Sequence, residues 1–226
     1  MVFLIPRFDF SAVTDHWQFL LQGLVVTLEV CALGMLLATA LGLAVAVLRI
    51  YGGKTVDRGL GFVVDVMRSI PLLALMVWVF YALPVLVNGE MSPFLAGVIS
   101  LGVQYAAFMS EVFRAGLGSI SPGQRLAALA LGMTPFQALY RVIVPQAAVR
   151  MLPPMGSQLV SLIKDSSLLY GIAVAELMHQ AATLNGLYAR PFEIFTAIAI
   201  VYVVLTYPVT LGVNAVYRRL VPLTAG

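Results

Sequence analysis

The chain has 226 residues, of which 61% are hydrophobic and only 10% are charged. A soluble domain has about a quarter of its residues charged, so this composition excludes that class and indicates a polytopic membrane protein. The net charge of +3 comes from scattered Lys and Arg residues, which form no basic patch for a nucleic acid. Cys31 is the only cysteine, which excludes an internal disulfide and a thiolate metal cluster.

Five stretches are long and apolar enough to cross a bilayer, whose hydrocarbon core takes about 20 residues of helix. They predict an all-α protein with five transmembrane helices, at about 17–48, 60–87, 93–113, 154–177 and 192–217. In the first of these spans, Gly34, Ala38 and Gly42 recur at four-residue spacing. Such a stripe of small residues lets a second helix approach closely.

The basic residues predict the orientation, because loops rich in Lys and Arg stay in the cytoplasm. If the N-terminus is outside, the outer loops hold only Arg7 and Arg190. The inner loops then hold Arg49, Lys54, Arg58, Arg114, Arg125, Arg141, Arg150, Arg218 and Arg219. The sequence therefore predicts an outer N-terminus, an inner C-terminus and a cytoplasmic position for residues 121–145.

Residues 121–145 predict two short helices joined at a fixed elbow. The stretches Ser121-Pro122-Gly123-Gln124 and Thr134-Pro135-Phe136-Gln137 each place a hydroxyl at N-cap, Pro at N1 and Gln at N3, the pattern of a capping box. Gly132 supplies the left-handed residue at which the first helix ends. The second helix is expected to carry an apolar ridge, formed by Phe136, Leu139, Tyr140 and Ile143. That ridge requires a groove, or the membrane surface, to cover it.

The stretch Gly53-Lys54-Thr55 imitates the end of a phosphate-binding loop. The full loop needs a glycine five residues before Gly53, where Leu48 stands, and a preceding strand instead of a membrane helix. No other stretch has the pattern. If ATP powers this protein, we therefore expect another chain to bind it.

Arg68 is a functional candidate, because an ionisable side chain at membrane depth costs a few kcal/mol. Pro71 follows three residues later, lacks a backbone N–H and crowds the carbonyl of Met67, so it predicts a kink or break. A cation beside a broken helix is typical of an anion site. The alternative is that Arg68 reaches the inner headgroups or pairs with Asp65.

A second polar group, Lys164-Asp165-Ser166-Ser167, lies near the middle of the fourth span, about 18 Å along the helix from Leu152. These residues line a translocation path, cap a half-helix or neutralise one another as a buried pair. Glu111 precedes Arg114 by three residues, a spacing that favours an ion pair. No nucleophile stands beside a base and no carboxylates have metal-site spacing, so neither a catalytic residue nor a metal ligand is predicted.

Several motifs in the same order resemble permease subunits of bacterial ABC importers for polar amino acids, most closely the glutamate/aspartate permeases. The coupling-loop signature is matched by 111–116, Gly123-Gln124, Ala127-Ala128, Gly132-Met133 and 144–147. Residues 67–71 are similar to the arginine–proline motif of the second span, and 164–168 with 174–177 to the motif of the fourth. The resemblance runs from about residue 20 to the C-terminus.

The resemblance implies one transmembrane permease domain over residues 1–226, multi-pass in a bacterial inner membrane and without a cofactor. It implies alternating access, substrate delivery by a periplasmic amino-acid-binding protein, and ATP hydrolysis by two separate cytoplasmic ATPase subunits, so this chain is not expected to be an enzyme. Membrane lipid is a further partner, and nucleic acid is not.

The elbow is similar to the coupling helices that lie in a groove of the ATPase. The implied coupling residues are Gln124, Leu126, Ala127, Ala128, Gly132 and Phe136. Leu126 and Leu129 stand where the family usually has a glutamate and an arginine. Docking here is therefore expected to rest on apolar packing, with a second, different permease chain supplying the ionic contact in a heterodimer.

The implied substrate-binding residues are Arg68, Lys164, Asp165 and Ser166. Arg68 is expected to take a carboxylate bidentately, and Asp165 to face the ammonium group. Leu72 and Leu73 stand beside the break, where no carboxylate is present to favour a basic side chain. The similarity to the glutamate/aspartate permeases implies that the substrate is an acidic amino acid. The alternative is a stand-alone secondary transporter or channel that uses these intramembrane charges itself. A docking elbow disfavours that alternative.

Overall fold

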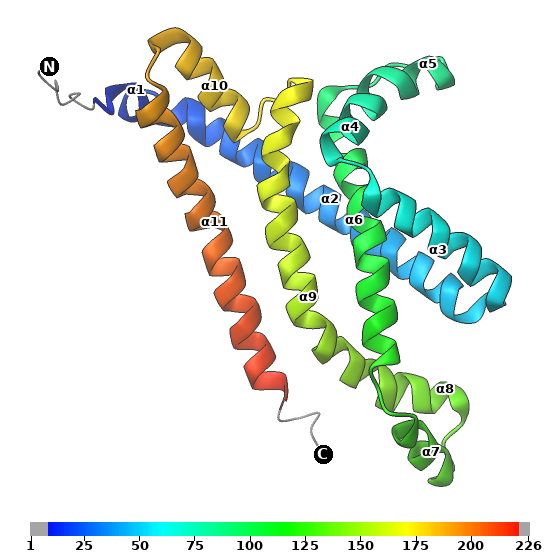
Figure 1. Cartoon of the computed structure of the whole chain (residues 1–226). Helices are drawn as coiled ribbons and strands as arrows, with labels where there is room; N and C mark the ends of the chain where they lie inside the picture. Colours follow the sequence, from blue (N-terminus) through cyan, green and yellow to red (C-terminus); the bar gives the residue numbers. More distant parts are fainter. Residues whose placement is uncertain (1–8, 222–226) are drawn as a thin grey trace, which may run out of the picture.

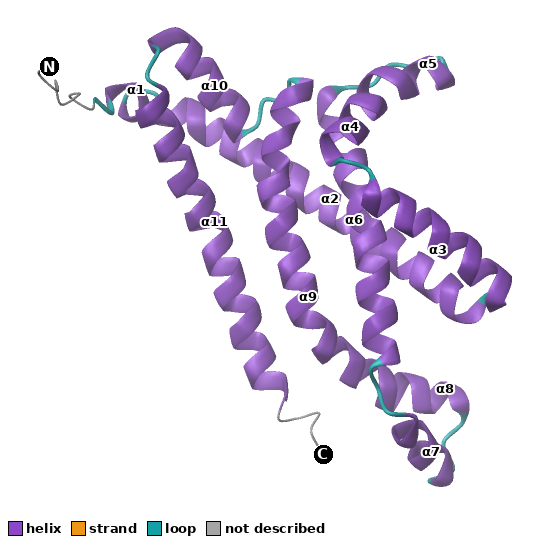
Figure 2. Ribbon diagram, in the orientation of Figure 1, coloured by secondary structure: helices purple, strands orange, loops and turns teal. Residues whose placement is uncertain are grey.

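The structure is a computed structural model that describes residues 9–221, and over that range it is helical without strands (Figures 1 and 2). The longer helices are α2 (Trp17–Tyr51), α3 (Gly53–Ser69), α6 (Pro93–Gly118), α9 (Val144–Asp165), α10 (Leu177–Tyr188) and α11 (Pro191–Leu220). The shorter ones are α1 (Ser11–Thr14), α4 (Leu72–Val77), α5 (Leu83–Val87), α7 (Pro122–Ala130) and α8 (Pro135–Ala138). π-helical segments occupy Trp78–Ala82 and Leu139–Ile143, and a 3₁₀ helix occupies Ser166–Ile172.

Helices α2 and α6 pack closely and form the centre of the main core (Figure 1). The stripe of Gly34, Ala38 and Gly42 is buried on the face of α2 that meets α6. The backbone carbonyl of Ala106 and the Cβ of Met109 lie against Gly42. The predicted close approach is confirmed, because no side chain keeps the two backbones apart at this point.

Three described helices, α2, α6 and α11, are long and apolar enough to cross a membrane. They match the first, third and fifth predicted spans. A fourth candidate exists only if α3 and the segment Leu72–Val87 count as one broken span, since they meet at 100°. The second predicted span is therefore not one continuous helix from 60 to 87.

The region of the fourth predicted span, 154–177, also differs from one continuous helix. Helix α9 starts earlier, at Val144, and its α-helical turns end at Asp165. Pro153 and Pro154 lie inside it, and it is not among the candidate membrane spans of the described residues. Beyond it the chain continues as a 3₁₀ helix and then turns through Ala173, whose φ of 59° is left-handed.

Residues 178–191, which join the fourth and fifth predicted spans, are mostly the helix α10. Glu176 caps this helix: its carboxylate accepts the backbone N–H groups of Met178 and His179 at 2.8 and 2.7 Å. Beside the end of α10, Arg190 donates to the carbonyl of Asp9 at 3.0 Å and pairs with its carboxylate. These contacts hold the start of the described chain against the start of α11. The other predicted outer arginine, Arg7, lies outside the described residues.

Candidate functional site

The chain breaks between α3 and α4 directly after Arg68. Ile70 and Pro71 are extended, with ψ of 130° and 129°, because a residue before proline avoids the helical region and proline offers no N–H to continue the helix. The break frees the carbonyl of Ile70 from the helix. The Nε2 of Gln104, on α6, donates to that carbonyl at 2.6 Å. The predicted break beside the arginine is confirmed.

The Arg68 side chain reaches away from the break towards α6. Its guanidinium lies 5.4 Å from the ring centroid of Phe108, over the ring face, and 4.0 Å from Asp65 Oδ1. The side chain is 40% exposed and Asp65 is 76% exposed, so the ion pair with Asp65 contributes at most about 1 kcal/mol. The Asp65 contact that the sequence offered as an alternative is therefore present but weak, and the guanidinium keeps donors for another group.

Arg68 lines a cavity of about 410 Å³ between α3, α6 and α9. Arg150 and Gln158 of α9 and Glu111 of α6 line the same cavity. Glu111 is already engaged by Arg49 and Arg114. The two remaining arginines give the cavity a surplus of positive charge, which suits an anionic group.

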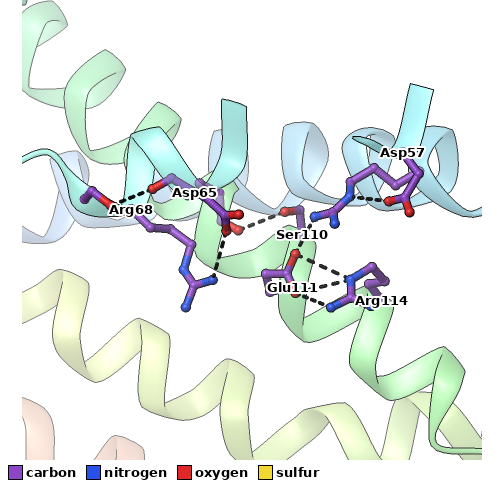
Figure 3. A network of polar contacts seen from close by, with 9 residues as sticks. Asp57, Asp65, Arg68, Ser110, Glu111 and Arg114 are labelled. Carbon is purple, nitrogen blue, oxygen red and sulfur yellow. Dashed lines mark hydrogen bonds and ion pairs between the residues drawn. The ribbon is translucent and has the colours of Figure 1, made fainter. Parts of the chain in front are cut away.

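Glu111 is the centre of a charge network at one end of α6 (Figure 3). Arg114 Nη2 lies 2.6 Å from Glu111 Oε2, which confirms the predicted ion pair. Arg49 of α2, with a side chain only 11% exposed, also pairs with Glu111, and its Nε donates to Asp57 of α3 at 2.9 Å. The network therefore joins three helices, although the sequence indicated only the pair within α6.

Asp165 lies where α9 changes from α-helix to 3₁₀ helix. The hydroxyl of Tyr105, on α6, donates to Asp165 Oδ2 at 2.7 Å. Ser166 and Ser167 turn back on the helix, their hydroxyls donating to the carbonyls of Ile163 and Lys164, each at 2.8 Å. Ser166 is buried, so its hydroxyl serves the local turn in this conformation.

Lys164 points elsewhere. It is exposed and lines a second cavity, of about 320 Å³, together with Ser157 and Ser161 of α9 and with Thr210 and Asn214 of α11. Among the described residues no ion pair joins Lys164 to Asp165, so the predicted buried pair is not present. The four predicted substrate-binding residues are thus divided: Arg68 lines one cavity, Lys164 lines another, and Asp165 and Ser166 stand at the end of α9.

The elbow forms as two short helices, but only one of its predicted capping boxes is complete. Thr134 Oγ1 accepts the N–H of Gln137 at 3.2 Å, and Gln137 Oε1 accepts the N–H of Thr134 at 2.9 Å. Ser121 Oγ instead accepts the N–H of Gly123. Gln124 does not return to Ser121, because its Oε1 accepts a bond from Gln146 Nε2 at 3.4 Å.

Gly132 adopts the left-handed conformation that was predicted, with φ of 80°. Its N–H donates to the carbonyl of Leu129 at 3.0 Å, and the next N–H, of Met133, donates to Ala128 at 3.2 Å. This pair of bonds is a Schellman motif, which ends α7 and turns the chain towards α8.

The predicted ridge on the second helix of the elbow is divided by a π-helical turn over Leu139–Ile143. A π turn changes the phase of the helix, so four residues at helical spacing no longer share one face. Phe136 and Tyr140 are exposed and their rings stack, whereas Leu139 and Ile143 are half-buried. The prediction of one apolar ridge was therefore wrong, and the exposed part is an aromatic pair.

Of the predicted coupling residues, Leu126, Ala127 and Phe136 are exposed, and Leu126 and Phe136 are 66% and 74% accessible. Ala128 is buried within the elbow and Gln124 is half-buried, so these two support its shape. Leu131, which the sequence analysis did not single out, is 80% exposed beside them. The elbow presents large apolar side chains that this chain does not cover.

Sequence reasoning missed Gln104, which contacts the break at Ile70, and Tyr105, which contacts Asp165 at the end of α9. The sequence indicates both only as two adjacent polar residues inside the apolar stretch 93–113. It also missed that Glu176 is fully buried, with Tyr202 donating to it at 3.2 Å. Within residues 9–221 no group of three or more His, Cys, Asp and Glu side chains is placed to hold a metal ion.

Comparison with known proteins gives matches over most of the chain. The profile of the family described as "Binding-protein-dependent transport system inner membrane component" matches residues 38–224. The glutamine transport system permease protein GlnP of Escherichia coli (strain K12) is 32% identical over 215 residues, covering 95% of this chain and 98% of that protein. The L-cystine transport system permease protein TcyL of Bacillus subtilis (strain 168) is 33% identical over 201 residues, covering 86% and 84%.

The glutamate/aspartate import permease protein GltK of Escherichia coli O6:H1 is 32% identical over 220 residues, covering 94% of this chain and 98% of that protein. Among solved structures, a crystal structure of an amino acid ABC transporter with histidines superposes with a TM-score of 0.86 at 29% identity. It covers 95% of this chain and 100% of the other.

Proposed function

Because the chain belongs to the family of binding-protein-dependent transport system inner membrane components, we propose that it forms part of the translocation pathway of an importer for acidic amino acids. In this family the permease is a membrane subunit and separate ATPase subunits hydrolyse ATP, so the chain is not itself an enzyme. The relatives named as glutamine, cystine and glutamate/aspartate permeases support an amino acid as the substrate.

The observation that carries the proposal is the break beside Arg68. An interrupted helix exposes backbone groups that a membrane protein tolerates only where they meet protein or line a cavity, and such breaks are typical of substrate sites in transporters. Arg68, just before the break, lines the cavity of about 410 Å³, where its guanidinium is expected to take a substrate carboxylate.

The charge of that cavity favours glutamate or aspartate over neutral amino acids. Arg68 and Arg150 both line it, and its one carboxylate, Glu111, is engaged by two arginines. A substrate with two carboxylates gains an attractive interaction that glutamine lacks. Asp165, Ser166 and Lys164 are proposed to contact the substrate in a conformation that brings α9 closer to the break, with Asp165 facing the ammonium group.

We propose five spans, with the N-terminus outside and the C-terminus in the cytoplasm. The excess of Lys and Arg in the loops on the proposed inner side supports this orientation. The bent segment from Gly53 to Val87 and helix α9 are the two spans that depart from regular apolar helices. Both carry polar groups proposed for the pathway. The proposed location is a bacterial inner membrane.

The chain works with ATPase subunits and a second permease, as its family does. We propose that the elbow, with Leu126, Leu131 and Phe136 exposed, docks in a groove of the ATPase subunit. Since the elbow offers apolar contacts where the family usually has charges, a heterodimer with a differently charged permease is proposed, and a periplasmic binding protein supplies the substrate.

The test is uptake of radiolabelled L-glutamate, L-aspartate, L-glutamine and L-cystine into proteoliposomes that contain the complete complex and its binding protein. We expect ATP-dependent uptake, with L-glutamate and L-aspartate preferred over L-glutamine and L-cystine when the substrates compete. Arg68→Ala is expected to abolish uptake while the ATPase subunits still co-purify, and Arg58→Ala serves as the matched control. Normal uptake by Arg68→Ala would place the substrate elsewhere. Uptake without any ATPase subunit would support the stand-alone transporter instead.

A further inference from the structure

Two adjacent residues of α6 donate hydrogen bonds to the two places where a helix is interrupted, the break after α3 and the end of α9. Gln104 donates to the carbonyl of Ile70 at the break after Arg68, and Tyr105 donates to the carboxylate of Asp165 at the end of α9. Both side chains are buried, at 5% and 3% exposure. We propose that Gln104 and Tyr105 are positioning residues that set the substrate-binding geometry of Arg68 and Asp165, an inference that rests on the proposed function.

The position of the two residues on α6 explains how one helix reaches both segments. Consecutive residues of an α-helix point about 100° apart, so neighbours contact different partners. Gln104 reaches the break between α3 and α4, and Tyr105 reaches the end of α9. Because α6 is continuous from Pro93 to Gly118, the separation between the two contacts is set by a rigid element.

The bond from Gln104 matters because of where the freed carbonyl lies. A backbone carbonyl without a hydrogen bond in an apolar interior costs free energy, so the extended conformation of Ile70 and Pro71 depends on a donor from elsewhere. Gln104 Nε2 is that donor at 2.6 Å. Removing it favours other conformations of the segment and so changes where Arg68, two residues earlier, is presented.

The bond from Tyr105 engages one oxygen of Asp165 and leaves the other for a ligand. Tyr105 donates to Oδ2, and no other hydrogen bond or ion pair to this carboxylate occurs within residues 9–221. A hydroxyl that donates to one carboxylate oxygen fixes the orientation of the group. Oδ1 is therefore left to accept a hydrogen bond from the ammonium group of an amino acid.

Tyr105→Phe tests this role by removing only the hydroxyl. The chain offers a matched control in Tyr202→Phe, which removes the hydroxyl of a half-buried tyrosine that also donates to a carboxylate, that of Glu176, at 3.2 Å. Affinity is measured on the purified complete complex without its binding protein, using radiolabelled L-glutamate and L-glutamine. We expect Tyr105→Phe to weaken binding by about tenfold, as for a lost hydrogen bond to a charged group, and Tyr202→Phe to leave it within about twofold.

A double-mutant cycle with Asp165→Asn separates positioning from a general effect on folding. If Tyr105 acts through Asp165, Tyr105→Phe weakens binding little further in the Asp165→Asn background. Gln104→Met keeps the volume of the side chain and loses its hydrogen-bond donor. It is expected to weaken binding in both backgrounds, because Gln104 acts on the break at Ile70 and so on Arg68, and not on Asp165. An unchanged thermal melting temperature of the complex confirms that the Tyr105 effect is local.

The outcomes distinguish this inference from the proposed function. If wild-type complex transports an amino acid and Asp165→Asn weakens binding, but Tyr105→Phe binds like wild type, the positioning role is wrong and the proposed function stands. Equal losses from Tyr105→Phe in both backgrounds also contradict it. If the wild-type complex transports none of the tested amino acids with ATP, the proposed function fails and the inference fails with it.

Discussion

A Cβ atom on Gly42 of α2 would lie 2.8 Å from the Cβ of Met109 of α6 and 2.9 Å from the carbonyl oxygen of Ala106. Both distances are shorter than ordinary contact, and the second involves backbone, so the helices must separate to admit a methyl group. We expect Gly42→Ala to destabilise the protein by about 1–3 kcal/mol, the usual cost of overpacking.

Gly59→Ala is the matched control for that substitution. Gly59 lies inside α3, where a Cβ meets nothing within 4 Å. Replacing a helical glycine by alanine there is expected to be neutral or to stabilise by up to about 1 kcal/mol. Thermal unfolding of both variants in the same detergent checks the difference, and equal melting temperatures would contradict the close packing of α2 on α6.

Arg49→Gln is expected to loosen the charge network of α2, α3 and α6. Arg49 is largely buried and bonds both Asp57 and Glu111. Breaking a fully buried pair costs about 3–5 kcal/mol and an exposed one about 0–1, so we expect a loss of roughly 2 kcal/mol for this intermediate case. Thermal unfolding measures it, with exposed Arg58→Gln as the control. A loss no larger than that of the control would show that the network contributes little.

Gly132→Val is expected to separate ATP hydrolysis from uptake. Its φ of 80° is unfavourable for any residue with a Cβ, and a β-branched side chain is worst, at a cost of about 1–3 kcal/mol. The Schellman motif that sets the angle of the elbow would then be lost. Measured on the reconstituted complex, ATPase activity should persist while uptake per ATP falls. Gly123→Ala, at an ordinary φ, is the control, and unchanged coupling in Gly132→Val would refute the role of the elbow angle.

Phe136→Ala is expected to weaken attachment of the ATPase subunit. Phe136 is 74% exposed and its ring lies parallel to Tyr140, with centroids 6.4 Å apart. A large aromatic anchor at an interface is commonly worth about 2 kcal/mol or more, which corresponds to roughly thirtyfold in affinity. Binding of the purified ATPase to the permease pair checks this, with equally exposed Leu187→Ala on α10 as the control. Unchanged affinity would exclude the aromatic pair from the docking surface.

Asp9 is expected to titrate at about pH 2. The backbone N–H of Ser11 donates to its carboxylate at 2.9 Å and, together with the Ser11 hydroxyl and Arg190, lowers the pKa of Asp9 from 3.8 to about 2. Because the pKa of Asp9 is lower in the folded state than in the unfolded chain, the charged carboxylate stabilises the folded state. This stabilisation is fully present above about pH 3.8 and is lost as the pH falls through about 2. The tie between Asp9 and Arg190 therefore does not change between pH 5 and 8.

Substituting Arg190 tests which partner controls that pKa. Arg190→Gln should raise the pKa of Asp9 but leave it below 3.8, because the Ser11 N–H remains and is the larger cause. NMR titration of the carboxyl carbon in lipid nanodiscs measures it, with Arg125→Gln as the control. A pKa of 3.8 or above in Arg190→Gln would show that the arginine, not the backbone, holds the carboxylate in its charged form.

Local features were predictable because each depends on a few neighbouring residues. Proline at 71 offers no N–H and disfavours the helical conformation of Ile70, glycine at 132 permits a left-handed turn, and Thr134 with Gln137 completes a capping box. The sequence pattern gave a wrong prediction where more than one helical conformation or hydrogen-bond partner was available. The π turn at Leu139–Ile143 moved the predicted ridge, and Gln124 bonded Gln146 instead of completing the first box.

The sequence by itself determined the class of protein, the closely packed stripe of α2, the break beside Arg68 and the elbow, since composition, spacing and single prolines or glycines suffice for these. Only the tertiary structure decided the 100° bend, the contacts of Gln104 with Ile70 and of Tyr105 with Asp165, and the bond from Arg49 to Glu111. Those contacts join residues 34 to 62 positions apart. No local spacing specifies them, because they depend on which faces of the helices meet once the apolar surfaces have packed.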